Sequence, residues 1–322
     1  MARPRFLPDN FMLILLALIV AASVLPVRGV YAGHAATLTN AAIALLFFLH
    51  GAKLPLQSVI AGLGHWRLHS LVFACTFLLF PLLAVLLKPV LLPLVGPDLY
   101  RGLLYMSSLP STVQSAIAFT SVARGNVPAA ICAAATSSLL GVFVTPLLVV
   151  LLLGQAGHGL SMGDAVLKIM LQLLLPFVLG QIARPWIGAW VDRNKSWLKH
   201  VDQWSIYLVV YTAFSKAVVD GLWSKLPLAQ LLLLAAACAG LLFIVLQLTW
   251  RLGRRLGFSL EDRITLLFAG SKKSLATGVP MAQVLFAGSA MGAVLLPIMV
   301  FHQIQLLVCA VLSKRFAARP AD

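Results

Sequence analysis

Residues 270–280 read Gly-Ser-Lys-Lys-Ser-Leu-Ala-Thr-Gly-Val-Pro and lie in the middle of an otherwise apolar segment. This polar run, with Gly270 before the two lysines and Gly278 and Pro280 after them, predicts that a helix is interrupted here. A lysine at the centre of a bilayer costs about 2.5–3.5 kcal/mol on insertion scales, so Lys272 and Lys273 indicate a functional site. The alternative is an interfacial loop whose lysines reach water. Apolar residues 266–269 and 279–286 on either side favour the membrane interior.

The whole chain has the composition of a membrane protein. It has 322 residues, of which 61% are hydrophobic and 10% charged, whereas a soluble domain carries about 25% charged residues. Apolar stretches long enough to cross about 30 Å of hydrocarbon recur along it. We predict an all-α polytopic membrane protein with about ten transmembrane helices, near residues 11–27, 36–53, 67–92, 98–123, 126–153, 163–191, 198–220, 226–252, 260–285 and 287–314.

The distribution of basic residues predicts the orientation. With ten spans, 16 of the 24 lysines and arginines fall on the side that holds both termini, six fall on the other side, and two lie within a span. Cytoplasmic loops are enriched in lysine and arginine, so we expect both termini in the cytoplasm (N-in/C-in) and the protein in the plasma (inner) membrane. The same rule accounts for the net charge of +15 without nucleic acid as a partner.

A second polar interruption occurs in the fourth predicted span. Residues 107–115 read Ser-Ser-Leu-Pro-Ser-Thr-Val-Gln-Ser and, like the ninth span, precede a small-residue turn, at 124–126 and 287–289, and a long apolar helix with a proline. Five spans separate the two copies, and an odd number inverts the second copy. We therefore predict two inverted five-helix repeats, about 11–153 and 163–314, within a single transmembrane transporter domain of residues 1–322.

The two interruptions supply the candidate binding residues. All nine acidic residues fall at span ends or in loops, so the site is electropositive and favours a small anionic solute such as a carboxylate, sulfate or phosphate ester. His302 follows the ninth span, and Ser138 contributes if it faces the fourth. The predicted substrate- or ion-binding residues are Thr112, Gln114, Ser115, Ser138, Ser271, Lys272, Lys273, Ser274 and His302.

Several motifs together resemble a known family. They are Phe-Leu-Leu-Phe-Pro at 77–81, Ala-Arg-Gly-Asn-Val at 123–127, Thr-Pro at 145–146 and Gly-Ser-Lys-Lys-Ser-Leu at 270–275. The chain resembles the bile acid:sodium symporter superfamily (solute carrier family ten), and in particular its SBF-like branch. The resemblance implies a panel domain and a core domain, with broken fourth and ninth helices that cross at their unwound centres. It also implies two sodium ions behind the crossing.

The sodium ligands that the resemblance implies are mostly missing. The family's glutamate falls on Leu267, its glutamine on Ser271 and its third-helix glutamine on Thr76. Ser138 and Ser115 remain as sodium candidates. We expect the two lysines to supply the positive charge in place of sodium, and one of them to exchange a proton. Na⁺, H⁺ or no coupling ion at all remain the alternatives. The alternative is that the lysines bind helix C-terminal carbonyls and stiffen the crossing.

The predicted function is secondary transport of an organic or phosphorylated anion by alternating access. The alternative is a non-transporting membrane regulator or sensor that uses the same cavity. An enzyme is not expected, because the chain has no His-Glu-x-x-His and no paired intramembrane aspartates. The four cysteines lack metal-ligand spacing, and no cofactor is expected.

Overall fold

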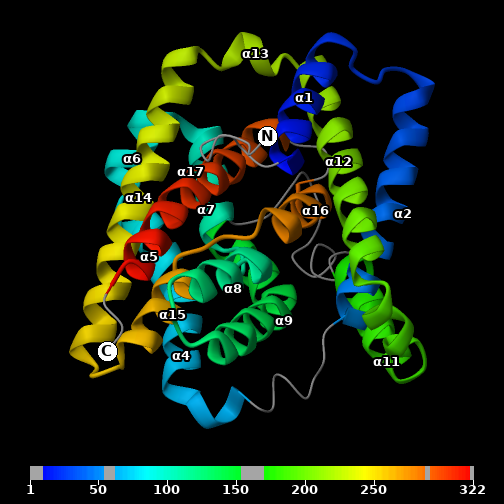
Figure 1. Ribbon diagram of the computed structural model, residues 1–322. Coiled ribbons are helices and arrows are strands. Elements are labelled where there is room, and N and C mark those ends of the chain that lie inside the picture. The colour runs from blue at the N-terminus through cyan, green and yellow to red at the C-terminus, as the bar shows by residue number, and fades with distance from the viewer. Residues whose placement is uncertain (1–9, 54–61, 154–169, 287–290, 320–322) are drawn as a thin grey trace, which may run out of the picture. The chain divides into compact units, whose positions relative to one another are not determined.

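The computed structural model describes residues 10–53, 62–153, 170–286 and 291–319, which form helices and no strand (Figure 1). The all-α prediction is confirmed for these residues. In the described part of the chain, five helices are long and apolar enough to cross a membrane, in agreement with a polytopic membrane protein: α2 (Val30–Lys53), the segment Trp66–Leu86, α9 (Val127–Leu153), α14 (Leu228–Arg255) and α17 (Met291–Ala317). The count of ten spans stays a prediction, and the turn at 287–289 and the start of the sixth span lie outside the described residues.

The chain divides into two compact units, each built from separate stretches of sequence. Unit 1 combines Met1–Pro55, Leu153–Pro227 and Ala276–Leu295, and unit 2 combines Leu56–Leu152, Leu228–Leu275 and Leu296–Asp322. Two units agree in number with the panel and core domains that the resemblance implies. The division does not test the predicted single domain of two consecutive repeats.

Unit 1 is built around a close helix pair. Its helices are α1 (Asn10–Val24), α2, η3 (Met170–Leu174), α11 (Leu175–Arg193), α12 (Lys195–Val219), α13 (Leu222–Lys225) and most of α16 (Leu275–Leu285). Glycines let α2 and α11 touch backbone to backbone, since Gly51 faces the Phe177 carbonyl and Gly180 faces the Phe48 carbonyl. Small residues at such contacts are typical of helix packing in membranes. A Lys53–Asp202 ion pair of 2.6 Å joins α2 to α12.

Gly180→Ala is expected to lower the free energy of unfolding by about 1–3 kcal/mol, because the new Cβ would overlap the Phe48 carbonyl oxygen and push the helices apart. Gly240→Ala is the matched control, because nothing lies within 4 Å of a Cβ at that helical position in α14. It should stabilise the protein by about 0.5–1 kcal/mol. Thermal unfolding in detergent compares the two variants, and equal effects would contradict the close packing.

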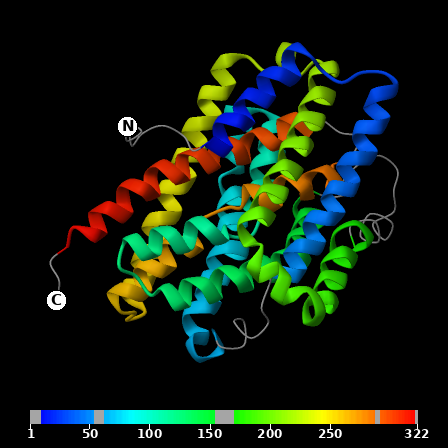
Figure 2. The same cartoon turned by 45° about the vertical axis from the view of Figure 1, so that its right-hand side comes forward.

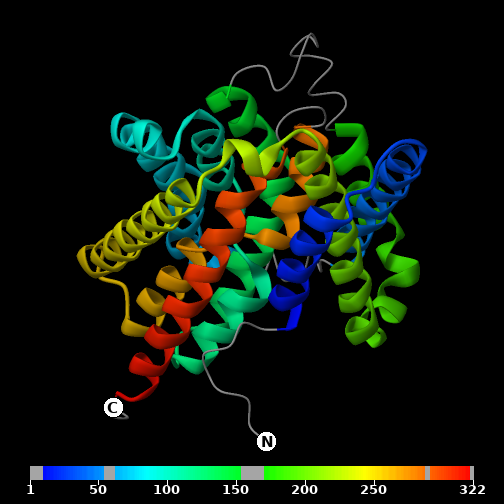
Figure 3. The ribbon, with the colours of Figure 1, turned by 90° about the horizontal axis from the view of Figure 1, so that it is seen from above.

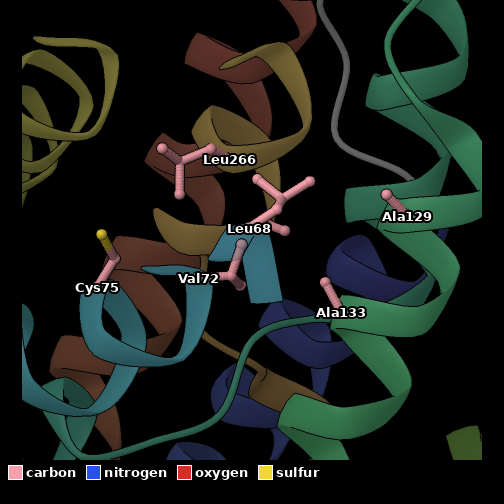
Figure 4. Close-up of a cluster of buried hydrophobic side chains, with 7 residues drawn as sticks. Leu68, Val72, Cys75, Ala129, Ala133 and Leu266 are labelled. Atoms are coloured by element: carbon pink, nitrogen blue, oxygen red, sulfur yellow. The ribbon is translucent and has the colours of Figure 1, made fainter. Parts of the chain in front are cut away.

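Unit 2 holds both helix interruptions, residues 108–112 and 271–274, and its own apolar core. Figure 2 shows α17 and Figure 3 shows α14 as long continuous helices. Leu68 and Val72 of α4 pack between Leu266 of α15 and two alanines of α9 (Figure 4). The helices of this unit are η1 (Gly62–His65), α4 (Trp66–Ala74), η2 (Cys75–Leu79), α5 (Phe80–Leu86), α6 (Lys88–Val95), α7 (Pro97–Ser107), α8 (Val113–Val122), α9, α14, α15 (Leu260–Gly270) and α17 from Leu296.

The turn between α8 and α9 is fastened to the start of α15. Asn126 Nδ2 donates to Asp262 Oδ1 at 2.8 Å, and Thr265 Oγ1 donates to the Asn126 carbonyl at 3.0 Å. Gly125 is required there because a Cβ would lie 2.8 Å from Ile264 Cγ2. The Ala-Arg-Gly-Asn-Val motif thus joins the end of α8 to the start of α15. Both of these helix ends are several residues away from the breaks.

Candidate functional site

The first interruption separates α7 from α8. α7 ends at Ser107, residues 108–112 are not helical, and α8 begins at Val113. Pro110 explains the break, because proline has no N–H and its ring disfavours a helical conformation at the preceding residue. α9 approaches this break closely at Gly141, where a Cβ would lie 2.6 Å from the Pro110 ring. A helix that ends inside the protein leaves its last carbonyl groups without helical partners.

The four carbonyls of residues 107–110 each have a hydrogen-bond partner elsewhere in unit 2. Lys273 Nζ donates to the carbonyls of Ser107 at 2.6 Å and Leu109 at 2.8 Å. Thr145 Oγ1 donates to the Ser108 carbonyl at 2.9 Å. The backbone N–H of Ser274 donates to the Pro110 carbonyl at 2.9 Å. The interruption is therefore a closed network, as expected for non-helical backbone at membrane depth.

The second interruption separates α15 from α16. α15 ends at Gly270, and residues 271–274 form the non-helical link that is visible in Figure 1. Gln305 of α17 binds both backbone groups of Lys273: its Oε1 accepts from the N–H at 2.9 Å, and its Nε2 donates to the carbonyl at 3.0 Å. Ser111 Oγ donates to the Ala269 carbonyl at 2.6 Å. The two breaks therefore bond directly to each other.

A third irregularity, in the Trp66–Leu86 segment, supplies one more free carbonyl. Cys75–Leu79 form a π-helical turn in which the Phe80 N–H bonds to the Cys75 carbonyl. The next donor in this register would be Pro81, which has no N–H, so the Thr76 carbonyl is left without a helical partner. Lys273 Nζ donates a hydrogen bond to this Thr76 carbonyl at 2.6 Å.

Lys273 and Lys272 lie in different surroundings, although both side chains are fully buried. Lys273 Nζ has three carbonyl partners and stands 4.3 Å from the centroid of the Phe80 ring. Lys272 Nζ has one longer hydrogen bond, 3.3 Å to Ser115 Oγ, and lies 3.9 Å from the centroid of the Phe119 ring. Neither lysine forms an ion pair with an acidic residue in the part of the chain that the structure describes.

A pair of hydroxyl groups adjoins Lys272. Thr112 Oγ1 and Ser115 Oγ are 2.6 Å apart, and either can be the donor. Thr112 is the residue before the first turn of α8, so the backbone N–H groups of that turn are close by in the chain. An ammonium, two hydroxyls and a helix N-terminus are together suited to an anionic group.

The structure brings some of the predicted site residues together and leaves others apart. Thr112, Ser115 and Lys272 are linked by the hydroxyl pair, Lys273 and Ser274 join the two breaks, and His302 Nδ1 lies 2.9 Å from Gln305 Nε2. Ser271 Oγ donates to the Leu267 carbonyl of its own helix. Gln114 is exposed and Ser138 is half-buried. Whether any of them binds a solute stays a prediction.

The sodium candidates have other neighbours. Ser115 Oγ lies next to the ammonium group of Lys272, which would repel an added cation. Beside the other candidate, Ser138, it is the preceding residue Ser137 whose Oγ accepts a hydrogen bond from the Ser111 N–H at 3.0 Å. Within the described residues no group of three or more His, Cys, Asp or Glu is placed to hold a metal ion.

Sequence reasoning missed the groups that complete the network. Thr145, Ser137, Gln305 and the carbonyl of Thr76 were not among the predicted site residues. A signal existed for Thr76, since the proline five residues later removes a donor in the π-helical register. A buried glutamine without a predicted partner was the corresponding signal for Gln305.

Cysteine labelling tests the exposure of this site. After replacement of the four native cysteines, cysteine at exposed Gln114 should react with a water-soluble thiol reagent faster than cysteine at Ser115 or Thr112. Cysteine at Ser111, which is fully buried, is the control and should stay unreactive. If position 114 is as inert as position 111, the exposed face of α8 meets lipid instead of an aqueous cavity.

Helices of spanning length, together with two interrupted helices that bond at their breaks, define a polytopic α-helical membrane protein of the kind that carries solutes through a discontinuous-helix site. Residues 9–318 match the sequence model of the SBF-like CPA transporter family, and the chain belongs to this family. The predicted resemblance is confirmed. The match makes the chain a transporter and not an enzyme.

Relatives with high coverage agree with this assignment. The chain is 62% identical to an uncharacterized protein of Pseudomonas aeruginosa, over 100% of this chain and 97% of the relative. It is 56% identical to the Escherichia coli K12 protein named "Putative symporter YfeH", over 96% and 92%. It is 30% identical to "Sodium/bile acid cotransporter 7" of Mus musculus, over 94% and 90%.

Proposed function

We propose that this transporter moves an organic or phosphorylated anion across the membrane by alternating access. The observation that carries the proposal is the buried ammonium of Lys272, which has a hydroxyl and an aromatic ring as neighbours and no acidic partner among the described residues. A buried charge without a counter-charge is costly. A carboxylate or phosphate oxygen would supply that counter-charge, and the hydroxyls of Thr112 and Ser115 would donate to it.

The interrupted helices support alternating access as the mechanism. In transporters built from inverted repeats, the solute site lies near the bilayer midplane between discontinuous helices. We propose that α7–α8 and α15–α16 are the fourth and ninth of about ten spans in two inverted five-helix repeats. Their breaks would then lie at the midplane, and one unit would move against the other during transport.

The proposed coupling ion is a proton, carried by Lys272. An anion favours the ammonium form, whereas the described residues of the protein offer the Lys272 Nζ atom one hydrogen bond of 3.3 Å and so give the charge little support. Anion binding and proton uptake are then linked, so the apparent affinity for the anion should rise as the pH falls. Sodium is not required in this scheme.

Flux into proteoliposomes tests the function directly. Thermal unfolding of the purified chain with carboxylates, sulfate and phosphate esters first selects the solute, since a ligand stabilises by RT ln(1 + [L]/Kd). The selected radiolabelled anion should then accumulate in sodium-free choline buffer when the lumen is alkaline and the outside acidic. Binding without any flux would support the regulator alternative, and flux that strictly needs sodium would overturn proton coupling.

We further propose that the protein lies in the plasma (inner) membrane with both termini in the cytoplasm, because 16 basic residues against six favour that side. Alkaline phosphatase fused after residue 322 should be inactive and a fluorescent protein fused there should be bright. The same pair of reporters before residue 1 should give the same result. Opposite results at the two ends would imply an odd number of spans.

A further inference from the structure

The ammonium of Lys273 has the ligand set of a bound monovalent cation. Three backbone carbonyl oxygens, those of Thr76, Ser107 and Leu109, lie 2.6–2.8 Å from Nζ, and the Phe80 ring covers it at 4.3 Å. Among the described residues, no side-chain oxygen accepts a hydrogen bond from Lys273 Nζ. Carbonyl oxygens are the ligands with which proteins replace the hydration shell of an alkali cation.

The positions of these oxygens are set by the backbone and not by the lysine. The Thr76 carbonyl is freed by the π-helical turn and Pro81, and the Ser107 and Leu109 carbonyls are freed by the break at Pro110. The break is held in place by other bonds, from Thr145 Oγ1 to Ser108 and from the Ser274 N–H to Pro110. The three oxygens should therefore still converge when the lysine side chain is shortened.

We propose that these three carbonyls and the face of Phe80 form a monovalent-cation site that the chain fills permanently with its own ammonium, Lys273. Three neutral oxygens without a carboxylate do not suit a divalent ion, which prefers charged oxygen ligands. Lys273 is then a positioning residue, and Lys272 alone meets the solute. Only this last assignment rests on the proposed function.

Vacating the site tests the proposal. Lys273→Ala and the matched Lys272→Ala are prepared as full-length proteins in choline buffer of constant ionic strength, and sodium, potassium, ammonium or ethylammonium chloride is titrated in. Each cation that fits should raise the unfolding temperature of the Lys273→Ala protein in a saturable manner, by roughly 2–4 °C at 0.1 M. The native protein and Lys272→Ala should change by less than about 1 °C. Equal responses in the two variants, or no response in Lys273→Ala, would overturn the cation site.

A measurement on the native protein covers the case in which Lys273→Ala does not fold. Reductive methylation followed by peptide mass spectrometry compares the two lysines within one molecule. Lys272, whose Nζ makes a single hydrogen bond of 3.3 Å, should be modified at least about ten times faster than Lys273, because three hydrogen bonds hold the Lys273 Nζ in its unreactive ammonium form. Equal rates would contradict the proposal.

The cation site and the proposed transport function fail in different ways. A flat cation response together with anion flux that depends on Lys272 would remove the cation site and leave the transport proposal standing. A saturable response in Lys273→Ala, in a protein that carries no anion, would do the reverse.

Discussion

Lys273→Met should lower the free energy of unfolding by roughly 3–5 kcal/mol. The thioether fills the space of the side chain but donates nothing to the carbonyls of Thr76, Ser107 and Leu109. Each buried acceptor that loses its partner costs about 1–3 kcal/mol, and relief from burying the ammonium offsets part of the sum. The loss is measured by denaturant or thermal unfolding of the purified protein.

Lys272→Met is the control for the preceding variant, because the two lysines are adjacent and both fully buried. Its Nζ makes one hydrogen bond of 3.3 Å and a contact with the Phe119 ring. The cation–π contact is worth about 0.5–2 kcal/mol, and removal of an unpaired charge compensates much of it, so the net change should stay within about 1 kcal/mol. A loss as large as that of Lys273→Met would show that the carbonyl contacts are not what distinguishes the two lysines.

Lys272→Gln has the largest expected effect on activity: the initial rate of anion uptake should fall at least about tenfold. The amide keeps a donor near Ser115 but carries no charge for the anion, and one lost charge-assisted bond of about 1.5–3 kcal/mol accounts for this factor. The unfolding temperature should stay near the native value. Uptake into proteoliposomes and thermal unfolding are measured on the same preparation.

Lys314→Gln is the matched control for charge, since Lys314 is exposed near the end of α17. It should transport normally. The pH dependence separates a binding role of Lys272 from a merely structural one. The native protein should bind the anion more tightly as the pH falls, and the Lys272→Gln protein should lose this dependence. Normal uptake or an unchanged pH profile in the Gln variant would exclude Lys272 as the solute-binding group.

Local sequence determined where the helices break and what class of protein results. Hydropathy identifies the spanning segments, because a segment inside lipid must form a helix that satisfies its own backbone hydrogen bonds and must carry apolar side chains. Pro110 ends a helix through covalent constraints that act within a few residues, and the polar Gly-Ser-Lys-Lys run marks an interruption in an otherwise apolar span. The predicted residues Lys272, Lys273, Thr112, Ser115 and Ser274 all lie at or beside the two breaks.

Only the tertiary structure decided what each of the two lysines does. In sequence they are equivalent neighbours, and the local pattern left both an anion-binding role and a carbonyl-binding role open. Beyond the end of α15 the two side chains have different partners, since Lys273 reaches carbonyls 164–197 residues away in sequence while Lys272 reaches Ser115. The identity of a buried donor's partners depends on which free carbonyls other segments bring within 3 Å. Because such contacts join distant parts of the chain, the pattern around residues 270–280 predicted a charged site but could not predict its ligands.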